Sequence, residues 1–234
     1  MKILLTNDDG YDAVGLKALI KALTPIAKVM VVAPAKNKSA CGHSLTLDKP
    51  LRLISVDDEY YKIDDATPTD CIYLSLGHLF KNGYRPDLVI SGINIGANMG
   101  EDITYSGTAS AAMEAVIHGV PAIAISQVCK DMCRSIVVDW DFELACKVIL
   151  DLISKIKNGS FPLAERKFLN VNIPPLKVKD CKGVKITKDK NKKIIKERND
   201  NNKNKFINKT VSFIKTYKKW RISRRCFLKS WIMY

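Results

Sequence analysis

The sequence has no long apolar run, and this excludes one large class of proteins. Among its 234 residues no stretch of about 18 consecutive apolar residues occurs, so we expect no membrane-spanning helix. The apolar segment Ile3-Leu4-Leu5 is too short for a secretory signal peptide, and we therefore expect a cytoplasmic protein. The composition, 47% hydrophobic and 26% charged, is typical of a globular fold and excludes a collagen-like or wholly disordered chain.

Patterns for zinc sites and disulfide frameworks are also missing. The seven cysteines are odd in number and include no Cys-x-x-Cys pair, and the four-residue spacing of Cys129 and Cys133 is unusual for zinc. We expect free thiols in a reducing compartment. The three histidines, His43, His78 and His118, are too scattered in the sequence for a histidine-based metal site.

The positive charge is concentrated at one end of the chain. The formal net charge of +14 would by itself suggest a nucleic-acid partner. Residues 1–187 hold 22 Lys and Arg against 21 Asp and Glu, a net charge of +1, whereas residues 188–234 hold 16 against 3, a net charge of +13. We therefore divide the chain into a near-neutral main domain, residues 1–187, and a basic tail, residues 188–234, which we expect to be poorly ordered.

Within the main domain, short apolar strands alternate with amphipathic helices. This alternation predicts a doubly wound, three-layer α/β domain with a mainly parallel sheet and helices on both faces. Residues 44–64 are expected to form a β-hairpin insertion. The expected strands are 2–6, 28–33, 87–91, 122–126 and 167–173, and the expected helices are 14–25, 69–80, 108–118 and 138–157.

Two adjacent carboxylates, Asp8 and Asp9, come directly after the first expected strand. Ligands of open α/β sheets bind at the carboxyl ends of the strands, and two buried carboxylates need a cation or hydrogen-bond donors to remain ionised. Oxygen ligands without nearby His or Cys favour Mg²⁺ or Mn²⁺ over zinc, and Ser39 and Asn94 could complete such a site. The alternative is a structural role, with Asp as the N-cap of the following helix.

A second polar loop, residues 92–107, matches neither the GxGxxG nor the GxxxxGK[ST] pattern. It ends in Tyr105-Ser106-Gly107-Thr108, directly before an expected helix, where free backbone N–H groups and two hydroxyls can bind an anion. The alternative is that Ser106 only caps the helix. A cation site and an anion site at the same edge of the sheet suggest metal-assisted chemistry on phosphate esters.

Four motifs in this order resemble those of the SurE family, the "survival protein" 5′-nucleotidases. They are Met1-Lys-Ile-Leu-Leu-Thr-Asn-Asp-Asp-Gly10; Val32-Ala-Pro-x-x-Asn-x-Ser39 with Ser44-Leu-Thr46; Thr67-Pro-Thr-Asp70; and Ser91-Gly-Ile-Asn-x-Gly-x-Asn98 through Tyr105-Ser-Gly-Thr108. The resemblance implies a Rossmann-like fold and a metal-dependent phosphomonoesterase that acts on nucleoside 5′- and 3′-monophosphates. Some members also shorten polyphosphate, and the family forms cytoplasmic homodimers or tetramers.

The resemblance also implies roles for individual residues, with one Mg²⁺ or Mn²⁺ ion per subunit. The metal ligands would be Asp8, Asp9, Ser39 and Asn94, and the phosphate would be held by Asn98, Ser106, Gly107 and Thr108. Catalysis would fall to Asp8, Asp9, Asn98 and Ser106. Asn7, Gly10 and Ser44 would shape the site.

The chain departs from the family pattern in its tail. Members usually continue through a β-extension that contains Gly and Pro and contributes to dimer contacts, whereas residues 188–234 contain no Gly, Ala or Pro. The Lys, Asn and Ile bias suggests a frameshifted or aberrant C-terminus that begins near Lys188. Two alternative functions follow: a nucleic-acid-binding protein that uses the basic tail, or a catalytically impaired member. We do not expect nucleic-acid binding, because no zinc finger, helix-turn-helix or aromatic-interleaved motif accompanies the charge.

Overall fold

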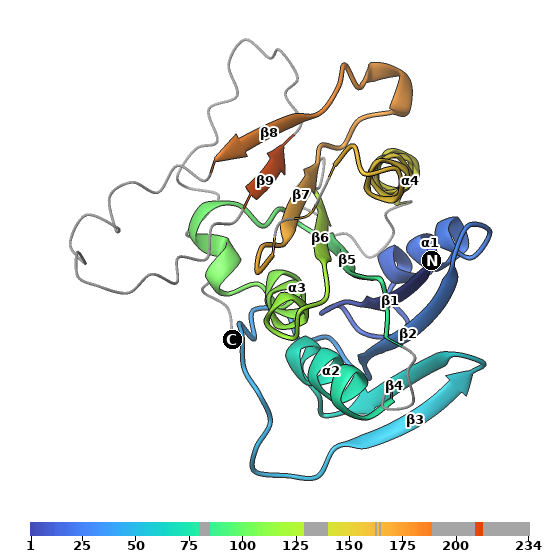
Figure 1. Cartoon of the computed structure of the whole chain (residues 1–234). Coiled ribbons are helices and arrows are strands. Elements are labelled where there is room, and N and C mark those ends of the chain that lie inside the picture. Colours follow the sequence, from blue (N-terminus) through green and yellow to red (C-terminus); the bar gives the residue numbers. More distant parts are fainter. Residues whose placement is uncertain (80–84, 129–139, 162, 164, 189–208, 213–234) are drawn as a thin grey trace.

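Five parallel strands form the centre of the sheet and carry the candidate site at their carboxyl ends. The computed structural model describes residues 1–79, 85–128, 140–161, 163, 165–188 and 209–212. The strand order of the nine-stranded sheet is β3-β4-β2-β1-β5-β6-β7-β9-β8 (Figure 1). The five central strands are β1 (Lys2–Thr6), β2 (Lys28–Pro34), β5 (Leu88–Ile95), β6 (Ala122–Gln127) and β7 (Leu169–Ile173). Each pairs in parallel with its central neighbours, as the sequence predicts.

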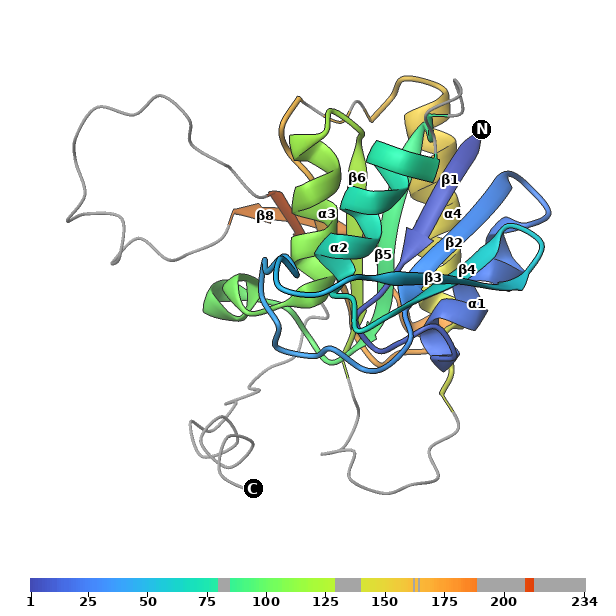
Figure 2. The same ribbon diagram turned by 90° about the horizontal axis from the view of Figure 1, so that it is seen from below.

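Four helices cover the two faces of this sheet. Leu4 faces one apolar core and its neighbours Ile3 and Leu5 face the other, because successive side chains of a strand point to opposite faces. Helices α1 and α4 pack on the core of Ile3 and Leu5, whereas α2 and α3 pack on the core of Leu4 (Figures 1 and 2). The predicted three-layer architecture is therefore confirmed. The helices are α1 (Val14–Leu23), α2 (Pro68–Leu74), α3 (Gly107–Ile117) and α4 (Glu143–Lys157).

The predicted hairpin extends one edge of the sheet. Strands β3 (Arg52–Asp57) and β4 (Tyr60–Asp64) pair antiparallel, and β4 pairs in parallel with β2. The strands begin later than the sequence suggests, because residues 44–51 form no strand. The backbone N–H and hydroxyl of Thr46 instead donate to the carboxylate of Asp70, at 2.9 and 2.7 Å.

The ends of two helices differ from the expected ones. Helix α2 begins at Pro68 behind a capping box, in which Thr67 and Asp70 bond each other's backbone N–H groups, and a π-helical turn follows at Ser75–Leu79. Helix α4 begins at Glu143 rather than at residue 138. Phe80 and residues 138 and 139, which the expected helices include, lie outside the described residues.

A short part of the tail joins the sheet beside β7. Strand β9 (Lys209–Ser212) pairs in parallel with β7 and antiparallel with β8 (Lys185–Lys188). The expected boundary between residues 187 and 188 therefore falls inside β8. Residues 189–208 and 213–234 lie outside the described part of the chain, so the expected disorder of residues 188–205 stays a prediction.

Membrane-spanning helices and disulfide bonds can be assessed for the described residues alone. None of the helices there is long and apolar enough to cross a membrane. Four cysteines within this part, Cys41, Cys71, Cys146 and Cys181, are free thiols. Cys129 and Cys133 lie outside it, as does Cys226.

Candidate functional site

Asp8 lies at the carboxyl end of β1 and points at the start of α3. Its side chain is buried, and its Oδ1 accepts a hydrogen bond of 2.5 Å from the hydroxyl of Thr108. Burial raises the pKa of this carboxyl group above its usual value, and hydrogen bonds from Thr108 and Gly107 only partly oppose the rise. The structure therefore brings three of the predicted site residues into one cluster.

Gly107 permits the close approach of α3 to β1. A Cβ atom at this position would lie 2.8 Å from Cβ of Asp8 and 3.0 Å from Sγ of Cys41. Any larger residue would push the helix away from the carboxylate. The partial positive charge of the helix N-terminus is thus held beside Asp8 because residue 107 has no side chain.

Asp9 is the second carboxylate of the pair. Its Oδ2 accepts a 3.4 Å hydrogen bond from the backbone N–H of Ile95, and its Oδ1 accepts one of 3.5 Å from Nδ2 of Asn37. Burial and the neighbouring Asp8 charge raise its pKa to about 6. Neither aspartate caps the following helix, because the N-cap of α1 is Ala13, which makes no side-chain cap.

Ser39 and Asn94 lie on segments that contact the aspartates. The backbone N–H of Lys38 donates to the carbonyl oxygen of Asp8 at 2.7 Å, which places the turn with Ser39 beside β1. The side chain of Asn94, near the end of β5, is buried, and its Nδ2 donates to the carbonyl of Gly96 at 2.9 Å. No hydrogen bond joins Ser39 or Asn94 to either aspartate among the described residues.

Ser106 caps α3, as the alternative interpretation expects. Its Oγ accepts a 3.0 Å hydrogen bond from the backbone N–H of Ala109, and the side chain is buried. The hydroxyl acts here as an acceptor, so its own proton is still available to a further acceptor. A capping role and an anion-binding role are therefore compatible at this residue.

Asn98 is held by side chains of the two neighbouring strands. Its backbone N–H donates to Oδ1 of Asn172 at 2.9 Å, and its Nδ2 donates to Oγ of Ser126 at 2.9 Å. Its carbonyl oxygen accepts from Nδ2 of Asn170 at 2.8 Å and of Asn172 at 3.1 Å. All four side chains are buried.

The shaping residues also make local contacts. Nδ2 of Asn7 donates to the carbonyl of Gly10 at 2.8 Å, and Gly10 has a φ of +104°, which favours glycine. The carbonyl of Ser44 accepts from the hydroxyl of Thr67 at 2.7 Å, which joins its loop to the start of α2. These contacts fix the turn after β1 and the loop after β2.

Comparison with known proteins decides the family. The family described as Survival protein SurE matches residues 3–196. The 5′-nucleotidase SurE of Aliarcobacter butzleri is 76% identical over 186 residues, which cover 80% of this chain and 71% of the relative. That of Sulfurovum sp. is 61% identical over 191 residues, which cover 82% and 72%.

The chain belongs to the SurE family.

A solved SurE-family structure agrees with the fold described above. The SurE protein of Aquifex aeolicus aligns with a TM-score of 0.71 and 44% sequence identity, covering 79% of this chain and 71% of that one. The match to the family ends at residue 196, so most of the basic tail lies outside it. The resemblance seen in the motifs is therefore confirmed over the main domain.

The donor atoms of this SurE-family site suit a hard divalent cation. The four predicted ligands offer only oxygen from two carboxylates, a hydroxyl and an amide. Neither aspartate has an ion pair with Lys or Arg within the described residues, and burial raises both pKa values. Among those same residues, no group of three or more His, Cys, Asp or Glu could hold a metal.

The sequence reasoning missed three residues of this chain that contact Asn98. Asn170 and Asn172 lie on β7 and Ser126 on β6, all within expected strands. A signal was present, because polar residues two apart in a buried strand point to the same face. The sequence alone does not say which loop that face contacts.

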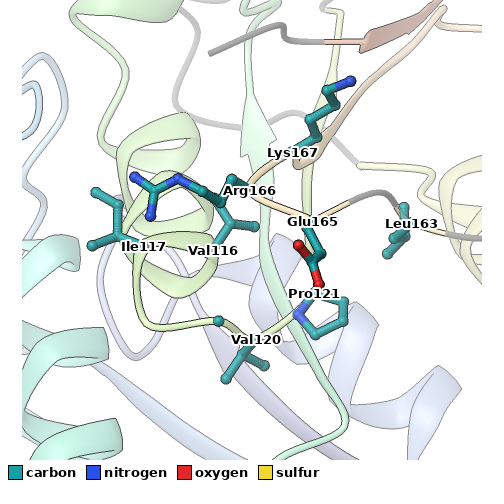
Figure 3. A pocket seen from close by; sticks show the side chains of 9 residues that line it. Val116, Ile117, Val120, Pro121, Leu163, Glu165, Arg166 and Lys167 are labelled. Atoms are coloured by element: carbon teal, nitrogen blue, oxygen red, sulfur yellow. The ribbon is translucent and has the colours of Figure 1, made fainter. Parts of the chain in front are cut away.

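A pocket of about 270 Å³ lies away from these residues. Its walls come from the end of α3, the start of β6 and residues that precede β7, including Pro121, Glu165 and Arg166 (Figure 3). These segments lie at the amino ends of the strands, whereas the candidate site lies at the carboxyl ends. We therefore do not assign this pocket to the candidate site.

Proposed function

We propose that the chain is a divalent-metal-dependent 5′-nucleotidase that hydrolyses nucleoside 5′-monophosphates to nucleoside and phosphate. The proposal extends to 3′-monophosphates and polyphosphate as further substrates. It depends above all on one observation: the buried carboxylate of Asp8 accepts a hydrogen bond from Thr108 at the N-terminus of α3, and the half-buried Asp9 follows it directly. Family membership supports it, since the relatives compared above are named 5′-nucleotidase SurE.

In this proposal Asp8, Asp9, Ser39 and Asn94 hold one Mg²⁺ or Mn²⁺ ion per subunit. A bound divalent ion would neutralise phosphoryl charge and acidify a coordinated water. The hydroxyl of Thr108 orients Asp8 through its 2.5 Å hydrogen bond. Asn94 presents its Oδ1, because its Nδ2 donates to Gly96. The cation would also relieve the unfavourable burial of the two carboxylates.

The substrate phosphate is proposed to lie against Asn98, Ser106, Gly107 and Thr108. The start of α3 offers backbone N–H groups and a partial positive charge to an anion. The proton of the Ser106 hydroxyl and the second N–H of the Asn98 amide would donate to phosphoryl oxygens. We assign catalytic roles to Asp8, Asp9, Asn98 and Ser106.

The test is hydrolysis of AMP by the purified full chain with Mn²⁺, Mg²⁺ or a chelator. We expect activity with metal and none with chelator. Asp8→Asn removes one ligand charge and should lower kcat/KM by about 100-fold or more. The control is Asp12→Asn, because Asp12 is exposed and pairs with Lys17. An Asp8→Asn enzyme with the wild-type rate in Mn²⁺ would refute the metal assignment.

Assembly, location and the tail remain predictions. We propose a homodimer or tetramer, weakened if the tail replaces a native dimer contact, and a cytoplasmic location. Analytical ultracentrifugation tests the assembly.

Nucleic-acid binding through the tail would produce DNA affinity that falls steeply with salt, whereas nucleotidase activity would instead disappear with chelator.

A further inference from the structure

We propose that Asn172 and Ser126 are positioning residues of the reaction, which act by holding Asn98 in place from strands β7 and β6. This inference rests on the proposed function, in which Asn98 binds the phosphate. Neither residue belongs to the predicted site. Both lie on strands that pair directly, with Asn172 opposite Ser126 in the parallel register.

The hydrogen bonds fix Asn98 at three different groups. Asn172 accepts from its backbone N–H at 2.9 Å and donates to its carbonyl at 3.1 Å. Ser126 accepts from its Nδ2 at 2.9 Å, which orients the carboxamide itself. Asn170 adds a second donor to the carbonyl at 2.8 Å. Backbone and side chain of Asn98 are thus fixed by separate contacts.

Burial makes these contacts costly to break. Ser126 is 0% exposed, Asn172 is 4% exposed and Asn98 is 8% exposed. A buried polar atom that loses its partner cannot turn to water instead, so the contacts rigidify the loop after β5. Asn94, a proposed metal ligand, is also opposite Ser126 in the sheet register. At this position the backbone of β6 therefore pairs with β5, which carries the proposed metal ligand, and with β7, which holds Asn98, whereas the Ser126 side chain bonds Asn98 alone among these residues.

Val171 provides a matched control on the same strand. It lies between Asn170 and Asn172, is fully buried, and faces the opposite core, which α1 and α4 cover. Val171→Ala therefore weakens the packing of β7 without removing a contact to Asn98. A loss of activity that only reflects a weakened strand would appear in this control as well.

The experiment is a double-mutant cycle with the full chain and AMP in Mn²⁺, at a temperature where every variant is folded. We expect Asn98→Ala and Asn172→Ala each to lower kcat/KM, by up to about 100-fold for a misplaced group. Because Asn172 acts through Asn98, the double variant should be no slower than Asn98→Ala. Val171→Ala should keep a near wild-type kcat/KM at a lower melting temperature.

A second variant covers the case in which Asn172→Ala does not fold. Ser126→Ala frees only the carboxamide of Asn98, and its effect on kcat/KM should also vanish in the Asn98→Ala background. In addition, Asn172→Ala and Ser126→Ala should weaken inhibition by inorganic phosphate while the Mn²⁺-induced rise in melting temperature persists.

Three outcomes would overturn the inference: additive losses in the double variants, wild-type kinetics of the single variants at Asn172 and Ser126, or an equal loss in Val171→Ala. A failure of the proposed function looks different. If Asn98→Ala has full activity, the role of Asn98 in the phosphate site is wrong, whatever the other variants do.

Discussion

In the folded protein, Asp9 lies where a negative charge is unfavourable unless a cation is bound nearby. Burial and the charge of Asp8 raise its pKa from 3.8 to about 6, so the folded state binds this proton more tightly than the unfolded state does. The metal-free protein should therefore lose stability as the pH rises from about 4 to about 6. Asp9, a proposed metal ligand, is thus a source of instability when no metal is bound.

The first prediction concerns the variant Asp9→Asn, which removes this titrating group. In chelator its melting temperature should exceed that of the wild type at pH 7, and the difference should shrink towards pH 4. Added Mn²⁺ should raise the melting temperature of the wild type and not of the variant. Calorimetry at several pH values measures this, with Asp12→Asn as the exposed control. A pH-independent difference would contradict the expected charge effect.

Ser106 caps α3 and is also proposed to bind phosphate, and two different substitutions can distinguish these roles. Ser106→Ala removes the cap on the Ala109 N–H and should cost about 1 kcal/mol of stability. It should also weaken inhibition by inorganic phosphate. Ser106→Asp keeps a capping oxygen, so its stability should stay near that of the wild type, yet its charge should repel phosphate. If phosphate inhibits Ser106→Asp normally, Ser106 acts only as a cap.

Helix α3 is joined to the loop after β2 by a buried carboxylate. Glu114 bonds Nε2 of His43 at 2.7 Å and Nε2 of His118 at 3.0 Å. Burial by itself would raise the Glu114 pKa, but the hydrogen bonds and charges of the two histidines outweigh it and lower the pKa below 4.5. The contact thus connects the helix of the proposed phosphate site with the loop that carries Ser39.

Glu114→Gln should destabilise the protein by about 2 kcal/mol at pH 6, because it weakens two charge-assisted hydrogen bonds. Since the folded-state pKa is lowered, this contribution is present above pH 4.5 and is lost as the pH falls through the lowered pKa. Thermal unfolding from pH 3 to 7 measures it, with Glu101→Gln, on the exposed turn before α3, as control. A difference that persists at pH 3 would exclude the ionic contribution.

The elements that the sequence predicted well share one physical property. Strands β1, β2, β5, β6 and β7 are buried in the sheet, so continuous apolar runs identify them. The pair of Asp8 and Asp9 was found because strand ends converge at one edge of a parallel sheet. Contacts between distant segments left no such local pattern. The bond from Asn172 to Asn98 and the bond from Glu114 to His43 depend on tertiary packing alone.

For the whole molecule, the tail has a structural consequence for β7. Strand β9 pairs with β7, and without it the outer backbone groups of β7 would have no strand partner. A buried strand that becomes an edge is prone to pair with other chains. The frameshift interpretation treats the tail as aberrant, whereas the pairing of β9 with β7 gives part of the tail a structural role.

A chain truncated after Thr187 tests which of these two interpretations of the tail is correct. All the predicted site residues precede that point, so we expect AMP turnover to persist. The exposed edge of β7 should lower the melting temperature and promote concentration-dependent association, measured by light scattering. If the truncated chain is inactive or unfolded while the full chain is a stable active dimer, the tail is a genuine part of the fold and the frameshift interpretation is wrong.

The order of strands in the sheet also has a consequence for biosynthesis. The ribosome makes Asp8 early, but Asn172, which holds Asn98, follows on the last of the central strands. At about 5–20 residues per second the interval is about 8 to 33 s. A nascent chain therefore carries its two carboxylates long before Asn172 can hold Asn98, the proposed phosphate ligand, in place. Turnover of a nucleotide would report that the chain has folded at least as far as β7.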